Sequence, residues 1–338
     1  MADVKTIGVL TSGGDSPGMN TAIRAVVRRA LAKGCKVKGI LKGYEGLISG
    51  EIIDLHAKDV SGILARGGTI LYTARCKDMM EEDGVKAAAA MCKRRGIDAL
   101  VVIGGDGSFR GAKALSEQGI NTVGIPATID LDIPCTDYSI GFDTAVNTAM
   151  EAIDKVRDTS ASHERASIIE VMGRGAGYLA LWCGIANGAE DMLIPEIYDG
   201  NEQQLIDNII DNRRRGKTHH IIVNAEGVGA SAALAERIQE ATGIQTRATI
   251  LGHMQRGGTP TARDRVYAST MGSLAVDVLL DGKTGRVICY KNGEFCDSDI
   301  NEALDMTRKL PEYQYEIAVS LSHNYYKTEA ESLLDKID

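Results

Sequence analysis

The sequence predicts an α/β protein of two domains, each with a mostly parallel β-sheet between two layers of helices. Short β-branched or apolar segments alternate with longer helix-like segments, a pattern typical of parallel sheets covered on both faces. The 338 residues exceed one typical core, and domains usually hold about 100 to 200 residues. The 44% apolar and 25% charged residues are typical of globular proteins. We therefore expect two Rossmann-like, three-layer α/β/α domains.

In chain order, the β-branched segments predict strands at residues 6–10, 36–41, 99–103, 121–125, 167–171, 220–224 and 286–290. The longer segments predict helices at residues 19–32, 81–95, 108–118, 143–157, 177–186, 202–215, 232–242, 262–280 and 312–325. No Pro- or Ser-rich linker is evident, and we place the domain switch near Gly141. The larger domain then comprises residues 1–141 and 254–304, and the smaller one residues 142–253 and 305–338.

Composition and charge exclude several functional classes. The 38 basic and 46 acidic side chains give a net charge of −8 and a pI near 5.4, unsuited to neutralising nucleic-acid or membrane phosphates. The N-terminus has no apolar signal region, and no run of about 18 apolar residues occurs, so we expect a cytoplasmic protein. The seven cysteines lie singly, without zinc-ligand spacing, which makes a structural metal or a disulfide framework an unexpected feature.

Ligands of open parallel sheets bind beyond the carboxyl ends of the strands, where this chain has glycine-rich loops. The segment Gly104-Gly-Asp-Gly-Ser108 joins a strand to a helix, offers backbone N–H groups to a phosphate chain, and places Asp106 to hold Mg²⁺. The alternative is a tight turn with an ordinary helix cap. The loop Gly13-Gly-Asp-Ser-Pro-Gly18 follows the first strand similarly, and its alternative is a plain helix entry.

Two carboxylates stand two residues apart in Thr128-Ile-Asp-Leu-Asp132, directly after another strand. If the backbone is extended there, Asp130 and Asp132 point to one face. One of them would accept a hydroxyl proton while the other helps to hold the metal, and Thr128 would donate to a phosphate in flight. The alternative is an acidic turn ahead of Pro134.

Several basic side chains in loops are candidates for phosphate recognition. The isolated arginines Arg75, Arg174 and Arg256 follow glycine or small residues in loops, and their planar guanidinium groups suit phosphate oxygens. Simple surface solvation is the alternative. Further candidates for sugar hydroxyls or phosphate near strand or loop ends are Arg165, Glu226, Arg247 and His253. The basic run at 213–217 is either a solvated helix end or an anion site for an effector.

Five motifs follow one another in a specific order: Thr11-Ser-Gly-Gly-Asp-Ser-Pro-Gly-Met-Asn20, Val102-Ile-Gly-Gly-Asp-Gly-Ser108, Thr128-Ile-Asp-Leu-Asp132, Glu170-Val-Met-Gly-Arg174 and Leu251-Gly-His-Met-Gln-Arg-Gly-Gly258. With them, the chain from about residue 5 to 305 resembles the bacterial ATP-dependent 6-phosphofructokinases. The resemblance implies transfer of the γ-phosphoryl group of MgATP to the 1-hydroxyl of fructose 6-phosphate, in a homotetramer under effector control. It also implies that the larger domain binds ATP and the smaller one fructose 6-phosphate.

The resemblance assigns roles to individual residues of this sequence. Asp130 is the implied general base and Asp106 the implied Mg²⁺ ligand. The groups implied to steady the transferring phosphoryl group are Gly14, Arg75, Thr128 and Arg174. The implied ATP site comprises Gly14, Tyr44, Arg75, Cys76, Gly105, Asp106, Gly107 and Ser108. The implied fructose 6-phosphate site comprises Thr128, Asp130, Met172, Gly173, Arg174, Glu226, His253 and Arg256, with Arg165 and Arg247 from a neighbouring subunit.

An effector site for a nucleoside diphosphate or phosphoenolpyruvate is also implied by the resemblance. Its residues would be Arg24, Arg28, Arg157, Glu190, Arg215, Lys217 and His219. Ala57 stands where the family typically has a further arginine, and Thr218 replaces a common lysine. We expect an effector response whose sign and strength the sequence leaves open.

Two departures from the family pattern lie in the loop after residue 126. Ala127 replaces a glycine, and Leu131 replaces an asparagine whose amide would contribute about 1 kcal/mol, so lowered activity is expected. Pyrophosphate-dependent relatives carry lysine at position 127 and aspartate at position 107; the small Ala127 and Gly107 favour ATP as the donor. Two alternatives stay open: a pyrophosphate-dependent enzyme of the same fold, and a weakly catalytic regulatory paralogue that binds nucleotide or sugar phosphate.

Overall fold

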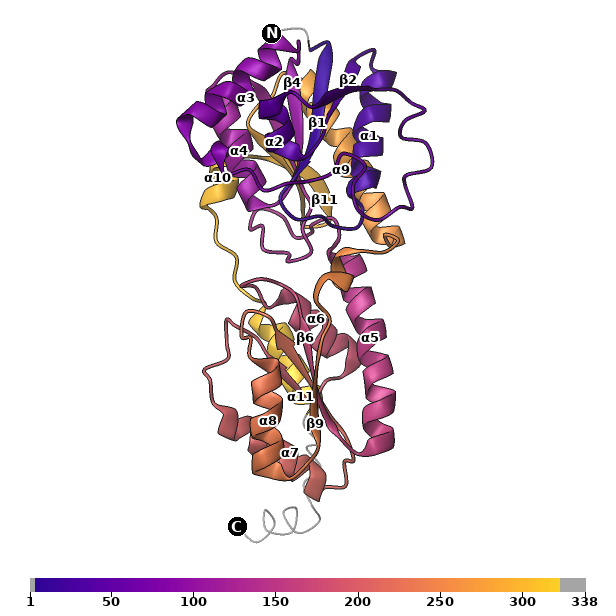
Figure 1. Ribbon diagram of the computed structural model, residues 1–338, viewed down its shortest axis with the longest axis vertical. Coiled ribbons are helices and arrows are strands. Elements are labelled where there is room, and N and C mark those ends of the chain that lie inside the picture. The colour runs from indigo at the N-terminus through magenta and orange to yellow at the C-terminus, as the bar shows by residue number, and fades with distance from the viewer. Residues whose placement is uncertain (1–3, 323–338) are drawn as a thin grey trace. The chain divides into compact units, whose positions relative to one another are not determined.

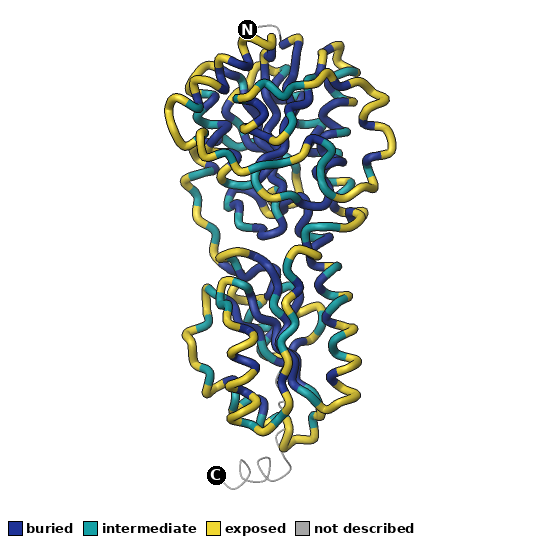
Figure 2. Tube along the Cα trace, viewed as in Figure 1, coloured by how far each residue is buried: buried dark blue, intermediate teal, exposed yellow. Residues whose placement is uncertain are grey.

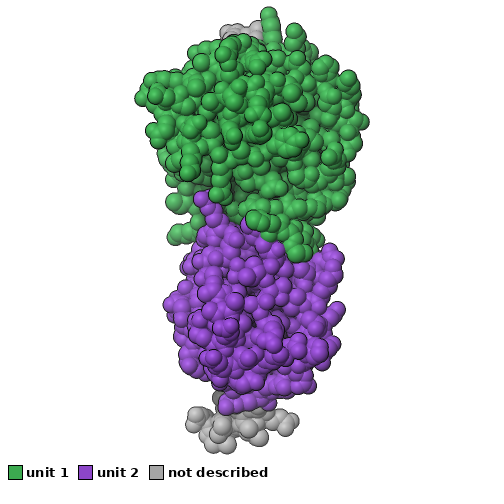
Figure 3. Space-filling view, in the orientation of Figure 1, with its two compact units in different colours: residues 1–148, 253–309 green, residues 149–252, 310–338 purple. Residues whose placement is uncertain are grey.

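The computed structural model describes residues 4–322 and divides the chain into two units (Figure 1). Unit 1 comprises Met1–Thr148 and His253–Lys309, and unit 2 comprises Ala149–Gly252 and Leu310–Asp338 (Figure 3). The first change of unit falls inside helix α5 (Phe142–His163), somewhat beyond the switch that we placed near Gly141. Within residues 4–322, no helix is long and apolar enough to cross a membrane.

Unit 1 is built on a seven-stranded sheet in the order β11-β10-β5-β4-β1-β2-β3. Its strands are β1 (Thr6–Ser12), β2 (Lys36–Ile40), β3 (Ile52–Leu55), β4 (Ala99–Gly104), β5 (Asn121–Pro126), β10 (Arg286–Lys291) and β11 (Glu294–Asp299). The five inner strands are parallel, and only the edge strands β3 and β11 pair antiparallel. Every residue of β1 and β4 is buried, as expected for parallel strands covered on both faces (Figure 2).

Helices cover both faces of this sheet. On one face, α1 (Met19–Ala32) and α9 (Ala262–Leu280) pack side by side over a core that includes Ile23 and Val26 (Figure 1). The buried positions of α1 recur at helical spacing, so its apolar side faces the sheet. The second face is covered by α2 (Gly43–Ser49), α3 (Glu82–Arg94), α4 (Asp106–Glu117) and α10 (Ile300–Asp305).

Unit 2 has a four-stranded, entirely parallel sheet in the order β7-β8-β6-β9. Its strands are β6 (Ala166–Val171), β7 (Asp191–Leu193), β8 (His220–Ala225) and β9 (Thr246–Ile250). One core joins the sheet to α7 (Glu202–Arg214) and α8 (Ser231–Thr242) through Leu205, Ile209 and Leu234. The remaining helices include α6 (Tyr178–Asn187), which packs on β7 and β8 and contacts α11 (Glu312–Ser322).

The predicted α/β fold with mostly parallel sheets is confirmed. All seven predicted strands form, as β1, β2, β4, β5, β6, β8 and β10, and all nine predicted helices have counterparts. The predicted helix at 312–325 is α11, whose last three predicted residues lie outside the described residues. The sequence analysis missed short elements, namely β3, β7, β9, β11, α2 and α10. These have three to seven residues each, too few for a clear period in the hydrophobic pattern.

Candidate active site

Three of the glycine-rich or acidic loops of unit 1 start at the same edge of the sheet. The register pairs Ser12 at the end of β1 with Gly104 at the end of β4, and Gly104 with Pro126 at the end of β5. The strand order reverses between β1 and β4, and open α/β sheets bind ligands at such a reversal. The loops that we singled out from the sequence therefore lie side by side at the position where this fold class binds ligands.

Side chains from distant segments form hydrogen bonds with the backbone of the first of these loops, the loop after β1. Thr73 Oγ1 donates to the Gly13 carbonyl at 2.8 Å, and Arg256 Nη1 donates to the Asp15 carbonyl at 3.1 Å. A Cβ on Gly14 would lie 2.7 Å from the same guanidinium nitrogen, so a side chain at position 14 would displace Arg256. The structure thus brings Gly14 and Arg256 together, although 241 residues separate Asp15 from Arg256.

The second loop leads into helix α4 through Gly105, whose cap position has no side-chain hydrogen bond. The first backbone N–H groups of α4 are therefore available for an anion, and the helix dipole favours one. Gly104 is sterically required, because a Cβ there would lie 2.5 Å from the Ser12 carbonyl. Beside Gly107, in contrast, a Cβ would meet no atom within 4 Å, so the space next to this helix start is open.

Tyr44 supports this helix start from beneath. Its phenol donates to the Ser108 carbonyl at 2.6 Å, and Ser108 Oγ donates to the Ser12 carbonyl at 3.0 Å. Burial raises the pKa of Tyr44 well above its ordinary value. With an exposed fraction of 3%, Tyr44 offers almost no surface to a nucleotide and instead fixes the loop that would hold one.

Asp106 is the first residue of α4, with 41% of its side chain exposed. Its carboxylate receives Arg110 Nε at 2.9 Å, an ion pair between residues four apart on the helix. No cluster of three or more His, Cys, Asp or Glu side chains suited to a metal occurs within residues 4–322. A single exposed carboxylate still fits Mg²⁺, because this ion usually takes one or two carboxylates and completes its shell with substrate phosphates and water.

The loop after β5 differs from one expectation. The chain bends at Ile129 and Asp130, and Leu131 has a left-handed backbone with φ = +55°. The backbone is therefore not extended, so the condition under which Asp130 and Asp132 would point to one face is not met, because a left-handed residue between them turns the chain. Asp130 is buried to an exposed fraction of 7%, and its backbone N–H donates to Thr128 Oγ1 at 3.2 Å.

Ala127 and Thr128 connect the second and third loops. The Ala127 N–H donates to the Gly104 carbonyl at 2.9 Å, and a Cβ on Gly105 would contact Thr128 Cβ at 3.9 Å. Thr128 lies next to the start of α4 and is partly exposed, whereas Ala127 is fully buried.

The remaining predicted site residues of unit 1 are Arg75, Cys76 and His253. Arg75 and His253 are exposed, and no hydrogen bond or ion pair of theirs is found within the described part of the chain. Cys76 is half-buried and packs against the core under α2, α3 and α4. Arg75 follows Thr73, which holds Gly13, so the segment that carries this arginine is joined to the first loop.

In unit 2, four predicted residues gather at the ends of two neighbouring strands. The register pairs Val171 of β6 with Ala225 of β8, and the next residues are Met172 and Glu226. Glu226 Oε1 accepts hydrogen bonds from the N–H groups of Gly173 at 3.2 Å and Arg174 at 2.5 Å. This carboxylate fixes a turn in which Arg174 has φ = +59° and presents an exposed guanidinium group.

Arg165 and Arg247 lie at the opposite end of the same strands. Arg165 precedes β6 and donates to the Gln245 side chain at 2.6 Å, while Arg247 pairs in register with Ser167. Ala166 and Val171, at the two ends of β6, are five steps of about 3.3 Å apart, which is roughly 16 Å. One chain therefore does not bring these two arginines to Met172 and Glu226.

Most of the predicted effector residues of unit 2 surround one buried carboxylate. Glu190, with an exposed fraction of 3%, pairs with Lys217 Nζ at 2.5 Å and with Arg157 Nη1 at 3.8 Å. Arg157 Nη1 also lies 3.5 Å from His219 Nε2, and burial lowers the pKa of His219. Arg215 is exposed at the end of α7.

The two effector candidates of unit 1 lie on α1. Arg24 and Arg28 are four residues apart and so share a helix face. Arg28 Nη2 donates to the Ala57 carbonyl at 3.1 Å. Ala57, where the resemblance implies a further arginine, is thus next to Arg28.

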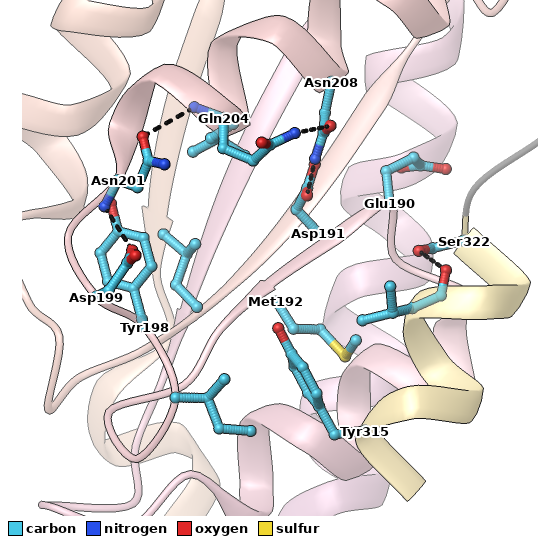
Figure 4. Close-up of a pocket in the computed structure, with 14 residues that line it drawn as sticks. Glu190, Asp191, Met192, Tyr198, Asp199, Asn201, Gln204, Asn208, Tyr315 and Ser322 are labelled. Atoms are coloured by element: carbon cyan, nitrogen blue, oxygen red, sulfur yellow. Dashed lines mark hydrogen bonds between the residues drawn. The ribbon is translucent and has the colours of Figure 1, made fainter. Parts of the chain in front are cut away.

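A cavity of about 480 Å³ in unit 2 borders this group (Figure 4). Glu190 and Asp191 lie on its wall together with Tyr198 and Tyr315, and Glu190 alone belongs to the predicted sets. Several of its polar groups are bonded to one another: Asn208 donates to Asp191 at 2.9 Å and accepts from Gln204 at 3.0 Å. Asp191 also receives buried His220 at 2.6 Å, so its charge is already partnered.

Sequence reasoning missed the residues that position the loops. Thr73 holds Gly13, Ser139 Oγ donates to the Thr128 carbonyl at 2.7 Å, and Ser16 Oγ donates to the Ile140 carbonyl at 2.9 Å. Their partners lie up to 124 residues away in the chain, and single hydroxyl residues in loops carry no sequence signal for such contacts.

Comparison with known proteins is consistent with this geometry. Residues 6–279 match the protein family described as Phosphofructokinase. The ATP-dependent 6-phosphofructokinase of Clostridium acetobutylicum is 59% identical over 320 residues, covering 94% of this chain and 100% of its own length. ATP-dependent 6-phosphofructokinase 1 of Clostridium perfringens is 58% identical over the same shares.

Solved structures show the same fold. Phosphofructokinase from Saccharomyces cerevisiae matches with a TM-score of 0.82 and 34% identity, over 94% of this chain and 48% of that chain. This chain therefore spans about half the length of the yeast chain. A pyrophosphate-dependent phosphofructokinase from Marinobacter aquaeolei, 22% identical with a TM-score of 0.81 over 92% of this chain and 86% of that chain, shares the fold. From the family match and the near-complete overlap with the clostridial relatives, the chain belongs to the phosphofructokinase family.

Proposed function

We propose that this chain transfers the γ-phosphoryl group of MgATP to the 1-hydroxyl of fructose 6-phosphate, giving fructose 1,6-bisphosphate and ADP. The chain is a phosphotransferase with an alcohol acceptor, the activity named for its clostridial relatives. The observation that carries the proposal is the alignment of the loops after β1, β4 and β5 at one sheet edge, where the strand order reverses. Two of these loops offer backbone donors and the third a carboxylate, as phosphoryl transfer requires.

In this proposal the residues of unit 1 bind ATP and perform the proton transfer. The free N–H groups at the start of α4 bind phosphate, with Gly104 and Gly105 allowing close approach. Asp130 accepts the proton of the attacking hydroxyl, and Thr128 donates to the transferring group. Gly14 supplies an N–H donor and Arg75 positive charge to the phosphoryl oxygens, which stabilises charge in the transition state. Arg174, to which the resemblance gives the same role, belongs to unit 2.

Asp106 is the proposed Mg²⁺ ligand, because it is exposed at the helix start that would hold the phosphates. Mg²⁺ bound together with ATP would neutralise charge on the β- and γ-phosphoryl oxygens. Arg110 competes for the same carboxylate, so it must release Asp106 or share it when the metal complex binds. The open space beside Gly107 and the fully buried Ala127 support ATP over pyrophosphate as the donor.

For fructose 6-phosphate, we assign Met172, Gly173, Arg174 and Glu226, which unit 2 brings together. Arg165 and Arg247 lie at the other end of that sheet. This position supports a homotetramer in which they bind the fructose 6-phosphate of a neighbouring subunit. The group around Glu190 would bind a nucleoside diphosphate or phosphoenolpyruvate effector through Arg157, Lys217 and His219. A cytoplasmic location is part of the same proposal.

Substitution Asp130→Asn tests the proposed base. The amide keeps the shape of the carboxylate but cannot accept the proton, so kcat should fall by about 10²- to 10⁴-fold while both KM values change little. Asp54→Asn is the matched control, since Asp54 is exposed on edge strand β3 and its carboxylate pairs with Lys38 at 2.7 Å, away from the three loops. Turnover of Asp130→Asn at the wild-type rate would refute the assignment of the base.

A further inference from the structure

Asp264 is a carboxylate with no exposed surface, three residues into the N-terminal end of α9. Its oxygens accept four hydrogen bonds. Oδ1 receives the Tyr138 phenol at 2.6 Å and the Gly141 N–H at 2.7 Å, and Oδ2 receives the Thr144 N–H at 2.9 Å and the Thr144 hydroxyl at 2.5 Å. All four donors come from residues 138–144, which connect the loop after β5 to the start of α5.

Residues 138–144 are in turn the base on which the loop after β5 rests. Ser139 Oγ donates to the Thr128 carbonyl at 2.7 Å, and the Ile140 N–H donates to the Pro126 carbonyl at 3.0 Å. Ile140 also forms a parallel bridge with Ala127. The position of Thr128, two residues before the proposed base Asp130, therefore depends on the segment that Asp264 holds.

The loop after β1 rests on the same segment. Ser16 Oγ donates to the Ile140 carbonyl at 2.9 Å. A Cβ on Gly18 would lie 2.6 Å from Ile140 Cγ2 and 3.6 Å from Asp264 Cβ, and a Cβ on Gly141 would lie 2.5 Å from Ser16 Cβ. The two loops that we assign to the transferring phosphoryl group thus pack on one segment. Asp264 bonds this segment to α9 through four hydrogen bonds, and Thr261 at the N-cap of α9 adds two, to Thr144 Oγ1 at 3.0 Å and to Asp143 Oδ2 at 2.6 Å.

Burial of a carboxylate at this position costs free energy unless hydrogen-bond donors compensate the loss of water. Burial of a charge without partners costs several kcal/mol, whereas a carboxylate with four donors is compensated. Two of the donors are backbone N–H groups, which can only donate. An apolar side chain or a neutral amide cannot accept from Gly141 and Thr144 together, so the carboxylate is matched to this segment.

We propose that Asp264 is a positioning residue for phosphoryl transfer, because its carboxylate fixes residues 138–144 and through them both Thr128 and the loop at Ser16. Asp264 touches neither substrate in this proposal and acts on the geometry of the reacting groups. The inference depends on the proposed function, because it is measured in the kinase reaction.

The test compares Asp264→Asn with the wild type and with Asp277→Asn. Either orientation of the introduced amide points its NH₂ group at a backbone N–H, that of Gly141 or of Thr144. Asp277 is a control on the same helix: its carboxylate pairs with Arg29 at 2.9 and 2.8 Å and joins α9 to α1 away from the loops. Each protein is checked by circular dichroism and thermal unfolding and is assayed well below its midpoint.

For Asp264→Asn we expect kcat to fall by about 10- to 100-fold, since displacements of reacting groups near 1 Å have effects of this size. The KM values for both substrates should change little, and Asp277→Asn should keep the wild-type kcat. A folded Asp264→Asn protein with wild-type kcat would overturn the proposal, as would an equal fall of kcat in Asp277→Asn. A wild type without turnover refutes the proposed function itself and is recognised before any variant is compared.

If Asp264→Asn does not fold, Tyr138→Phe and Thr144→Val decide the question. Each removes one hydroxyl donor and leaves the carboxylate with three of its four donors. Thr144→Val also removes the acceptor of the Thr261 N–H, so Tyr138→Phe is the cleaner of the two. A lower kcat at unchanged KM in either variant supports the positioning role. Wild-type kcat in both would overturn it.

Discussion

Leu131 combines a left-handed backbone with a buried side chain, and its substitutions therefore test the loop that carries Asp130. Its φ is +55° and its exposed fraction is 4%. The left-handed conformation costs a non-glycine residue about 1 to 2 kcal/mol. Burial of a leucine side chain contributes about 1.5 to 3 kcal/mol, so the side chain offsets the backbone strain.

Substitution of Leu131 by alanine and by glycine separates the cost of the left-handed backbone from the contribution of the buried side chain. Leu131→Ala loses the buried side chain but keeps the strain, and we expect the free energy of unfolding to fall by about 2 to 5 kcal/mol. Leu131→Gly loses the same contacts but relieves the strain, so it should be about 1 kcal/mol more stable than Leu131→Ala. Leu131→Asn should also be more stable than Leu131→Ala, since asparagine tolerates the left-handed region. It should still be less stable than the wild type, because it lacks the buried leucine side chain.

Leu115→Ala and Leu115→Gly are the control pair for the relative stability of the alanine and glycine variants. It is fully buried inside α4, where glycine is about 1 kcal/mol less stable than alanine. Urea unfolding followed by circular dichroism at one protein concentration measures all variants. At position 131 we expect the glycine variant to have a higher free energy of unfolding than the alanine variant. At position 115 we expect the alanine variant to have the higher value. If the alanine variant were more stable than the glycine variant at both positions, the reasoning would be refuted, because the left-handed backbone of residue 131 would then cost no free energy.

Three further predictions concern the loops and the subunit contacts. Gly104→Ala should lower kcat by at least about tenfold and reduce the thermal midpoint, because its Cβ would lie 2.5 Å from the Ser12 carbonyl, whereas Gly107→Ala should keep the wild-type midpoint. Mixing Asp130→Asn and Arg247→Ala subunits should restore activity that neither variant has alone, and mixed oligomers of verified composition without restored turnover would contradict shared sites. Lys217→Ala should abolish the response of activity to ADP or phosphoenolpyruvate while leaving turnover without effector unchanged, and an unchanged response would exclude Lys217 from the effector site.

Most of the architecture could be predicted because parallel strands carry strong local signals. The β4 sequence has no polar side chain, β1 is apolar from Ile7 to Leu10, and glycine-rich loops follow both strands directly. Edge strands such as β7, with three residues, have no such signal and form because a neighbouring strand supplies hydrogen bonds. The hydrophobic pattern therefore predicts the inner strands better than the edges.

The candidate site could be predicted only at the level of its motifs. The loops at Gly14, Asp106 and Thr128 are legible in the sequence because their residue types suit phosphate chemistry. The left-handed Leu131 could not be predicted, since a leucine gives no indication of a positive φ. Nor could the role of Asp264, whose partners lie 120 to 126 residues earlier in the chain and are recognisable only once the fold is formed.

The most direct test of the account is the aldolase-coupled turnover of the purified protein on fructose 6-phosphate with Mg²⁺, with ATP and pyrophosphate compared as donors. The open space beside Gly107 and the buried Ala127 predict rapid turnover with ATP and little with pyrophosphate. A preference for pyrophosphate would contradict the donor assignment. Binding of nucleotide without turnover on either donor would contradict the proposed activity and favour a regulatory protein of the same fold.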